Sequence, residues 1–294
     1  IQELGFVRNA SARQLRQGVS HTIAYVVLDA GNPFFTDVAR GVEDEAREHD
    51  LAVYLCNSAE DPARERAYLD QLLQQRVRGV CITPAGGSHD QLHHLVQAGI
   101  PVVLVDRRAA DEPFCSVGVD DVTGGSLAAT HLLERGHDRV AFVGPRAVLQ
   151  SADRLDGARK AFSAVGKSDE DLVVLETDSM TVGEGRVAGQ RLLGLSRRRR
   201  PTSVFCANDL LALGLLQQLM QTGVSVPDDI AIVGYDDIEF AAAAAVPLTS
   251  VMQPRLRLGR TAAQLLVDES ANSDHVHRHV EFMPELVVRQ SSGR

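Results

Sequence analysis

The sequence alternates short apolar runs with segments long enough to form helices, and the alternation continues along nearly its whole length. The runs are almost continuously hydrophobic, which indicates strands buried on both faces, as in a parallel sheet. Because parallel strands need crossover connections, the repeated strand–helix units predict a doubly wound α/β fold with right-handed crossovers. The predicted strands are residues 23–28, 51–56, 79–83, 101–105, 115–119, 139–144, 171–176, 202–207 and 230–235, and the clearest helices are 36–49, 63–76, 126–135 and 210–221.

The number of strands predicts two lobes. Roughly ten strands are more than one compact sheet usually holds. We place the first boundary near residues 143–153 and expect residues 248–253 and 277–289 to cross back and complete both lobes, with a ligand cleft between them. The expected lobes are an N-terminal one of residues 20–144 plus 248–272 and a C-terminal one of residues 145–247 plus 273–294.

Composition narrows the class of protein. Of the 294 residues, 44% are hydrophobic and 23% charged, as in soluble globular proteins. The apolar runs are much shorter than the roughly 20 residues of a membrane-spanning helix. A net charge of −9 argues against coating nucleic acid by bulk electrostatics. The four cysteines lie far apart without metal-ligand spacing, which predicts buried, reduced thiols in a cytoplasmic protein.

Polar side chains follow many of the predicted strands. In doubly wound sheets ligands bind beyond the carboxyl ends of the strands, so these side chains form the candidate site. Most are planar amides, carboxylates and guanidiniums, which make paired hydrogen bonds to neighbouring hydroxyls, and two adjacent phenylalanines can cover an apolar C–H face. The combination suits a sugar. The candidate residues are Asn32, Phe34, Phe35, Asp106, Arg107, Arg154, Asn208, Asp236 and Gln253.

Each of these residues also has a simpler interpretation. Phe34 and Phe35 open a predicted helix, where apolar side chains usually pack inward. Asparagine and aspartate at strand ends often cap helices or form turns. The convergence of six strand ends on one place favours the ligand site over these alternatives.

Other motifs give no catalytic prediction. The GKS tripeptide at residues 166–168 lacks a P-loop's first glycine, because Ala161 stands in that place. His275, His277 and His279 share one face of an extended segment, which allows a metal site but is more typical of a solvated strand face. No nucleophile elbow or zinc-protease motif occurs, so we predict that the chain is not an enzyme and uses no cofactor or metal.

Eight fragments, in order along the chain, carry a resemblance to a known family. They are "NPFF", "GVCITP", "IPVVLVDR", "GHDRVAFVGP", "CANDLLALG", "VPDDIAIVGYDDI", "PLTSVMQP" and "PELVVRQSS". With them, the sequence resembles the lactose-repressor/galactose-repressor (LacI/GalR) family of bacterial transcription regulators. The resemblance implies a two-lobed fold of the type I periplasmic-binding-protein kind.

The resemblance also implies a function. It suggests a DNA-binding repressor that regulates transcription in response to a small sugar, with the sugar held by residues matching the nine named above. The Asp106–Arg107 pair favours a ribose-like monosaccharide. Met180 stands where a ribose-type pocket usually has a second aromatic wall, and a methionine there changes the shape of the site. A palindromic operator needs paired readers, so a homodimer is expected.

Residues 1–19 resemble the end of a helix-turn-helix headpiece followed by a hinge helix, and the reading helices are expected before Ile1. Leu15 matches the leucine that wedges into the minor groove of operator DNA, with Ala12 and Arg13 beside it. The rival class is a periplasmic sugar-binding protein of a transporter, which would share the lobes and the pocket. Such a protein has no use for the segment "LGFVRNASARQLRQG", so the regulator is favoured.

Overall fold

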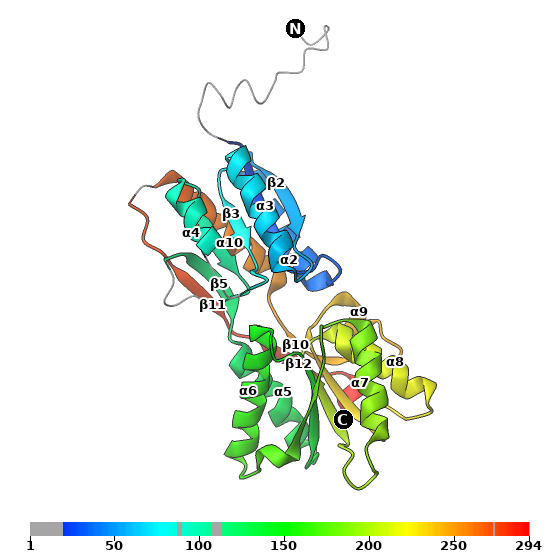
Figure 1. Cartoon of the computed structure of the whole chain (residues 1–294). Helices are drawn as coiled ribbons and strands as arrows, with labels where there is room; N and C mark the ends of the chain where they lie inside the picture. Colours follow the sequence, from blue (N-terminus) through cyan, green and yellow to red (C-terminus); the bar gives the residue numbers. More distant parts are fainter. Residues whose placement is uncertain (1–19, 87–89, 108–112, 273, 294) are drawn as a thin grey trace. The chain divides into compact units, whose positions relative to one another are not determined.

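The computed structural model describes residues 20–86, 90–107, 113–272 and 274–293. The chain forms two compact α/β units (Figure 1). Unit 1 lies within residues 1–118 and 255–280, and unit 2 within residues 119–254 and 281–294. The chain therefore passes between the units three times. Among the described helices, none combines the length and the apolar character needed to cross a membrane.

Unit 1 is built on a six-stranded sheet in the order β11-β5-β4-β3-β1-β2. The pairs from β5 to β2 are parallel, with Val26 of β1 opposite both Cys56 and Ile82. The strands are β1 (Thr22–Val27), β2 (Ala52–Asn57), β3 (Val80–Ile82), β4 (Val102–Val105), β5 (Cys115–Val119) and β11 (His279–Phe282).

The helices of unit 1 begin at clear sequence signals. Asn32 and Asp61 cap two of them, each accepting a hydrogen bond from a backbone N–H two residues on, and a proline follows each cap. Their apolar side chains pack on the sheet, and a core cluster includes Val26, Leu69 and Leu104. The helices are α2 (Pro33–Glu48), α3 (Pro62–Gln75), α4 (Asp90–Gln97) and α10 (Arg255–Ala271).

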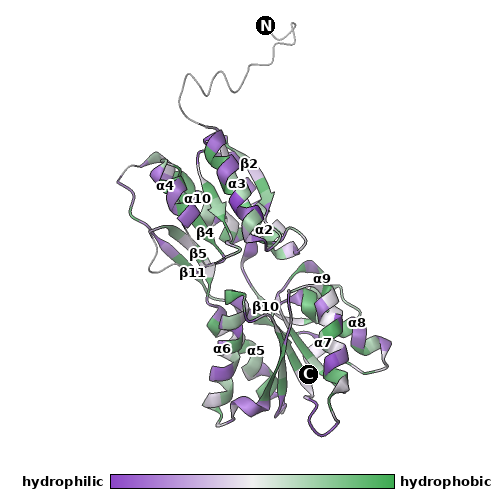
Figure 2. Cartoon of the chain, viewed as in Figure 1, coloured by the Kyte–Doolittle hydropathy of each residue, from purple (hydrophilic) through white to green (hydrophobic). Residues whose placement is uncertain are grey.

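Unit 2 repeats the plan with a six-stranded sheet in the order β12-β10-β9-β8-β6-β7. Only the β10–β12 pair in that sheet is antiparallel. Figure 2 shows helices that are hydrophilic on one side and hydrophobic on another, as expected when they cover a sheet. The elements are β6 (Val140–Gly144), β7 (Leu172–Glu176), β8 (Ser203–Cys206), β9 (Ala231–Asp236), β10 (Thr249–Met252), β12 (Glu285–Val287), α5 (Asp121–Glu134), α6 (Leu149–Ala164), α7 (Val182–Gly194), α8 (Asp209–Gln221), α9 (Glu239–Ala242) and short 3₁₀ turns at Asp169–Asp171 and Gln290–Ser292.

The two mostly parallel sheets confirm the predicted α/β fold class, but the lobe boundaries differ from those predicted. The first passage between units follows Gly118, not residues 143–153. Residues 119–144 belong to unit 2 because β6 pairs with β7 and β8 there. Residues 248–252 also belong to unit 2, since β10 pairs with β9, whereas residues 273–280 belong to unit 1.

One strand departs from the burial that its sequence predicts. β2 lies at the edge of its sheet, and Tyr54 and Leu55 on it are about half exposed. An edge strand has a neighbour on one side only, so a continuously apolar run does not guarantee burial.

Glycines allow α5 and α6 of unit 2 to pack unusually close together. A Cβ atom added to Gly125 would lie 1.9 Å from the backbone oxygen of Arg154. A Cβ atom on Gly157 would lie 1.9 Å from the oxygen of Val122. The backbone atoms of Arg154 and Val122 cannot move aside unless a whole helix shifts. These two glycines therefore set the distance between α5 and α6, and with it the position of Arg154.

We predict that Gly125→Ala destabilises the protein by about 3 kcal/mol, the upper end of the usual cost of overpacking. Urea unfolding followed by circular dichroism measures the change. The control is Gly194→Ala, at the end of α7, where an added Cβ meets nothing within 4 Å. This control should be neutral or stabilising by up to about 1 kcal/mol. Equal unfolding midpoints for the two variants would show that close packing at Gly125 does not matter.

Candidate functional site

The carboxyl edge of the unit 2 sheet gathers five of the residues predicted from the sequence. β9 ends at Asp236, and Gln253 directly follows the neighbouring strand β10. Asn208 caps α8 directly after β8. Arg154 lies on α6, which follows β6, and Met180 lies between β7 and α7. Because parallel strands end at the same edge, these separate segments meet there.

Arg154 is a buried cation held by several partners. Its side chain is 3% exposed, and its Nε donates a hydrogen bond to Oδ1 of Asp121 at 2.8 Å. Its Nη1 donates to the backbone oxygen of Ala207 at 2.6 Å and lies 3.9 Å from Oδ1 of Asp236. The guanidinium carbon lies 3.7 Å from the centre of the Tyr235 ring, a cation–π contact. The arginine is therefore fixed in place at the edge.

Asp236 and Gln253 form a second fixed pair. Nε2 of Gln253 donates to Oδ1 of Asp236 at 2.7 Å. A carboxylate only accepts, so the amide nitrogen faces Asp236 and Oε1 of Gln253 points elsewhere. Oε1 is buried and has no hydrogen-bond partner among the described residues. Buried acceptors are normally paired, so this oxygen is suited to receive a donor from a ligand.

Asn208 caps helix α8, and both Asn208 and Asp209 make hydrogen bonds to neighbouring segments at the carboxyl edge of the sheet. Oδ1 of Asn208 accepts from the backbone of Leu211 at 2.9 Å, while its Nδ2 donates to the backbone oxygen of Met180 at 3.1 Å. Asp209 is fully buried and accepts from Oγ of Ser250 at 2.7 Å and from the backbone of Ile238 at 2.9 Å. The capping interpretation therefore holds for Asn208, alongside its place at the edge.

Charge is crowded on this side of unit 2. Burial, and then the nearby Asp236 carboxylate, raises the pKa of Asp209 well above its usual range. Burial also raises the pKa of the Tyr235 phenol, with Asp121 adding to the effect. The edge therefore concentrates carboxyl groups around the buried guanidinium of Arg154, an arrangement suited to many directed hydrogen bonds.

In unit 1, β1 leads into the cap of α2. Oδ1 of Asn32 accepts from the backbone of Phe34 at 3.0 Å. The rings of Phe34 and Phe35 meet edge to face, with centroids 5.0 Å apart, and the residues are 2% and 4% exposed. Both phenylalanines therefore pack inward at the start of α2, as expected if they serve only as core residues. They also lie at the carboxyl end of β1, where the ligand interpretation places them.

The other predicted residues of unit 1 follow β4, on the far side of β3 from β1. Asp106 is buried and has a φ of 57°, and the backbone of Arg107 donates to the oxygen of Val117 at 3.3 Å. In unit 2, Asp236 has a φ of 99°. Positive φ is uncommon outside glycine and is enriched at functional sites. It occurs at strand-end aspartates of both units, including Asp237 next to Asp236, and also in turns such as the one at Ala59.

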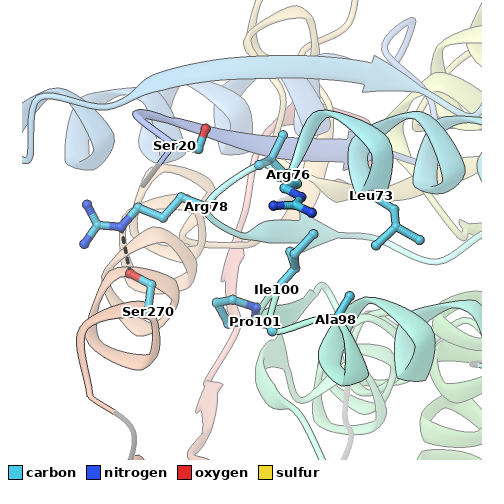
Figure 3. A pocket seen from close by; sticks show the side chains of 10 residues that line it. Ser20, Leu73, Arg76, Arg78, Ala98, Ile100, Pro101 and Ser270 are labelled. Carbon is cyan, nitrogen blue, oxygen red and sulfur yellow. Dashed lines mark hydrogen bonds between the residues drawn. The ribbon is translucent and has the colours of Figure 1, made fainter. Parts of the chain in front are cut away.

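A cavity of unit 1 lies away from these residues. It measures about 840 Å³ and is lined by residues that precede strands, including Ser20, Arg78 and Pro101. Figure 3 shows the side chain of Arg78 directed at Ser270, to which its Nε donates a hydrogen bond of 2.9 Å. This cavity is at the amino edge of the sheet, opposite to the edge at which doubly wound folds bind ligands, so it is not the candidate site.

Two residues that hold Arg154 were not among those predicted from the sequence. Asp121 and Tyr235 lie in α5 and β9. Asp121 follows β5, which was predicted as a strand over residues 115–119, so the strand-end rule would have found it had the residues after this strand been considered. Tyr235 gives no such signal, because it is one more apolar position of a buried strand. The predicted hinge residues Ala12, Arg13 and Leu15 lie outside the described residues.

Comparison with known proteins gives consistent matches. The model of the periplasmic binding protein-like domain matches residues 129–292. The HTH-type transcriptional repressor PurR of Aliivibrio fischeri (strain MJ11) is 32% identical over 99% of this chain and 87% of its own. The ribose operon repressor of Escherichia coli (strain K12) is 32% identical over 99% of this chain and 88% of its own. The structure of a LacI family transcriptional regulator from Enterococcus faecium with bound ribose is 30% identical, with a TM-score of 0.86 over 92% of this chain and 98% of that one.

Proposed function

Since this chain belongs to the LacI family of transcriptional regulators, we propose that it is a cytoplasmic, DNA-binding repressor whose effector is a ribose-like monosaccharide. In this proposal the sugar changes operator affinity through the hinge. A ligand shifts an equilibrium only by its different affinity for the two states, so the sugar must bind the operator-competent state more or less tightly than the other.

The observation that carries the sugar proposal is the fixed pair of Asp236 and Gln253 beside Arg154. The buried Oε1 of Gln253 can accept a hydrogen bond from one sugar hydroxyl, and the Asp236 carboxylate from another. The rigid contacts of Arg154 mean that little side-chain entropy is lost when a ligand binds. Sites that hydrogen-bond hydroxyls in this way reject analogues lacking them strongly.

The ribose-like class rests on two supports. A relative with 32% identity is named a ribose operon repressor, and a structural neighbour was solved with bound ribose. The other support comes from unit 1, where Asp106 and Arg107 supply a carboxylate and a guanidinium, and Phe34 and Phe35 supply apolar ring faces. Met180, in place of an aromatic wall, gives a flexible and adaptable surface, which is compatible with a sugar of somewhat different shape.

We predict that Asp236→Ala weakens sugar binding by roughly 2–4 kcal/mol, or about 30- to 800-fold in Kd, because it leaves buried partners unpaired. Isothermal titration calorimetry with ribose and related monosaccharides measures the change. Asp228→Ala, an exposed aspartate in the loop before β9, is the control and should bind like the wild type. Unchanged affinity in folded Asp236→Ala protein would remove this residue from the site.

For the operator, we predict that Leu15→Ala in the complete gene product weakens DNA binding and leaves sugar affinity nearly intact. The leucine is proposed to wedge into the minor groove, whereas the sugar contacts are proposed at strand ends. Fluorescence anisotropy with a palindromic operator should give a wild-type Kd of about 10⁻⁸ M or tighter. DNA binding that is absent under all sugar conditions would favour the rival periplasmic sugar-binding protein.

For assembly, we predict a two-fold symmetric homodimer, because a palindromic operator requires paired readers. Sedimentation velocity at micromolar concentration should show a species of twice the 31.8 kDa chain mass. The same measurement at a series of dilutions separates a stable dimer from a weak one. A single species at the chain mass throughout would contradict the dimer.

A further inference from the structure

Four side chains with metal-binding atoms meet in unit 1, at the amino end of β5. Cys115 is the first residue of β5, and Glu269 lies near the end of α10. His275 and His277 come from the segment that joins α10 to β11. The predicted sugar-binding residues of unit 1 lie at the opposite, carboxyl edge of the sheet, so this cluster is separate from them.

One metal-binding atom from each of the four side chains lies close to the other three. Sγ of Cys115 lies 3.0 Å from Nε2 of His275 and 3.9 Å from Nδ1 of His277. Oε2 of Glu269 lies 3.9 Å from each of the same two nitrogens. All four atoms lie within 4.8 Å of one another.

Cys115 and His275 are close enough to share a hydrogen bond, whereas the separations from Glu269 are nearer to those between ligands of one ion. The glutamate–histidine distances of 3.9 Å are too long for hydrogen bonds. In a tetrahedral zinc site, metal–ligand distances of about 2.0–2.3 Å place neighbouring ligand atoms roughly 3.3–3.7 Å apart. Oε2 of Glu269 is buried and accepts no hydrogen bond from a nitrogen or oxygen donor among the described residues, and the Cys115 thiol lies beside it.

The donor set and its surroundings indicate the kind of ion. Thiolate, imidazole and carboxylate are the three ligand types that zinc takes in proteins, and hard cations such as Mg²⁺ avoid sulfur. A divalent ion would balance one thiolate and one carboxylate. The backbone of Arg278 points its N–H at Sγ of Cys115, 3.3 Å away, as groups around metal-bound sulfur commonly do.

We propose that Cys115, Glu269, His275 and His277 form a binding site for one divalent transition-metal ion, of which zinc fits best. The side chain of His277 is 35% exposed, which gives the ion a route from solvent. The bound ion would tie the end of α10 to β5 and to the segment leading into β11. The chain leaves unit 1 directly after Gly118 of β5 and again after Val280 of β11, so the ion braces the segments that precede two of the three passages.

The test is titration of reduced, chelator-stripped protein with Co²⁺ alone, followed by displacement with Zn²⁺. We expect one Co²⁺ per chain, with the intense visible absorption of tetrahedral coordination and a thiolate-to-cobalt charge-transfer band. Zn²⁺ should abolish both and should raise the melting temperature, because an ion that binds only the folded state stabilises it.

Two variants assign the site to these residues. Cys115→Ser should remove the charge-transfer band, and His277→Ala should weaken Co²⁺ binding by more than about 100-fold, beyond the loss typical when only an outer partner is removed. Because His277 is partly exposed, its replacement should leave the fold intact. Matched controls are Cys56→Ser, a half-buried thiol elsewhere in unit 1, and His279→Ala, whose ring bonds Ser116 instead. Both controls should bind Co²⁺ like the wild type.

Two results would overturn the proposal. One is the absence of saturable binding at one equivalent of Co²⁺ in the wild type. The other is binding with unchanged affinity and spectrum in both Cys115→Ser and His277→Ala. Neither measurement involves sugar or DNA, so this result is independent of the proposed regulatory function.

Discussion

The side chain of Arg154 places a full positive charge inside unit 2, where only 3% of it is exposed. A charge removed from water is strongly destabilising unless it is paired and hydrogen-bonded. Asp121 on α5, the backbone of Ala207 after β8 and the ring of Tyr235 in β9 together meet this need. Because these groups belong to three different elements, α6 has to pack where all of them meet. The glycine contacts between α5 and α6 permit that approach, and the polar edge is ordered as a result.

The two edges of the unit 1 sheet carry different chemistry. At the carboxyl edge lie an amide, two aromatic rings and a strand-end aspartate, a combination that fits a neutral, hydroxyl-bearing ligand. At the amino end of β5 lie sulfur, imidazole and carboxylate donors, which fit a metal ion. If both are occupied, a regulator of this family responds to a sugar while a metal braces the segments that lead out of the same unit.

Local sequence signals predicted the individual elements well and their grouping less well. The first strand of unit 2, β6, was predicted within one residue. Helix α2 was predicted from residue 36 but begins at Pro33, directly after the Asn32 cap. The lobe to which β6 belongs was predicted wrongly, because sheet membership depends on pairing with strands far along the chain. The exposure of β2 was missed for the same reason, since a run of apolar residues does not reveal whether its strand lies at an edge.

The sequence by itself determined the α/β class, the family and most of the polar residues at the strand ends, because periodicity, capping and motif order are local properties of the chain. Only the tertiary structure decided which of those residues touch. Arg154 meets Asp121 across 33 positions, and Cys115 meets His275 across 160. The alternating histidines of His275–His279 are typical of the solvent-exposed face of a strand, and Cys115 is not part of any metal-binding sequence motif. Their meeting follows from the pairing of β11 with β5, a contact between distant segments that no local pattern encodes.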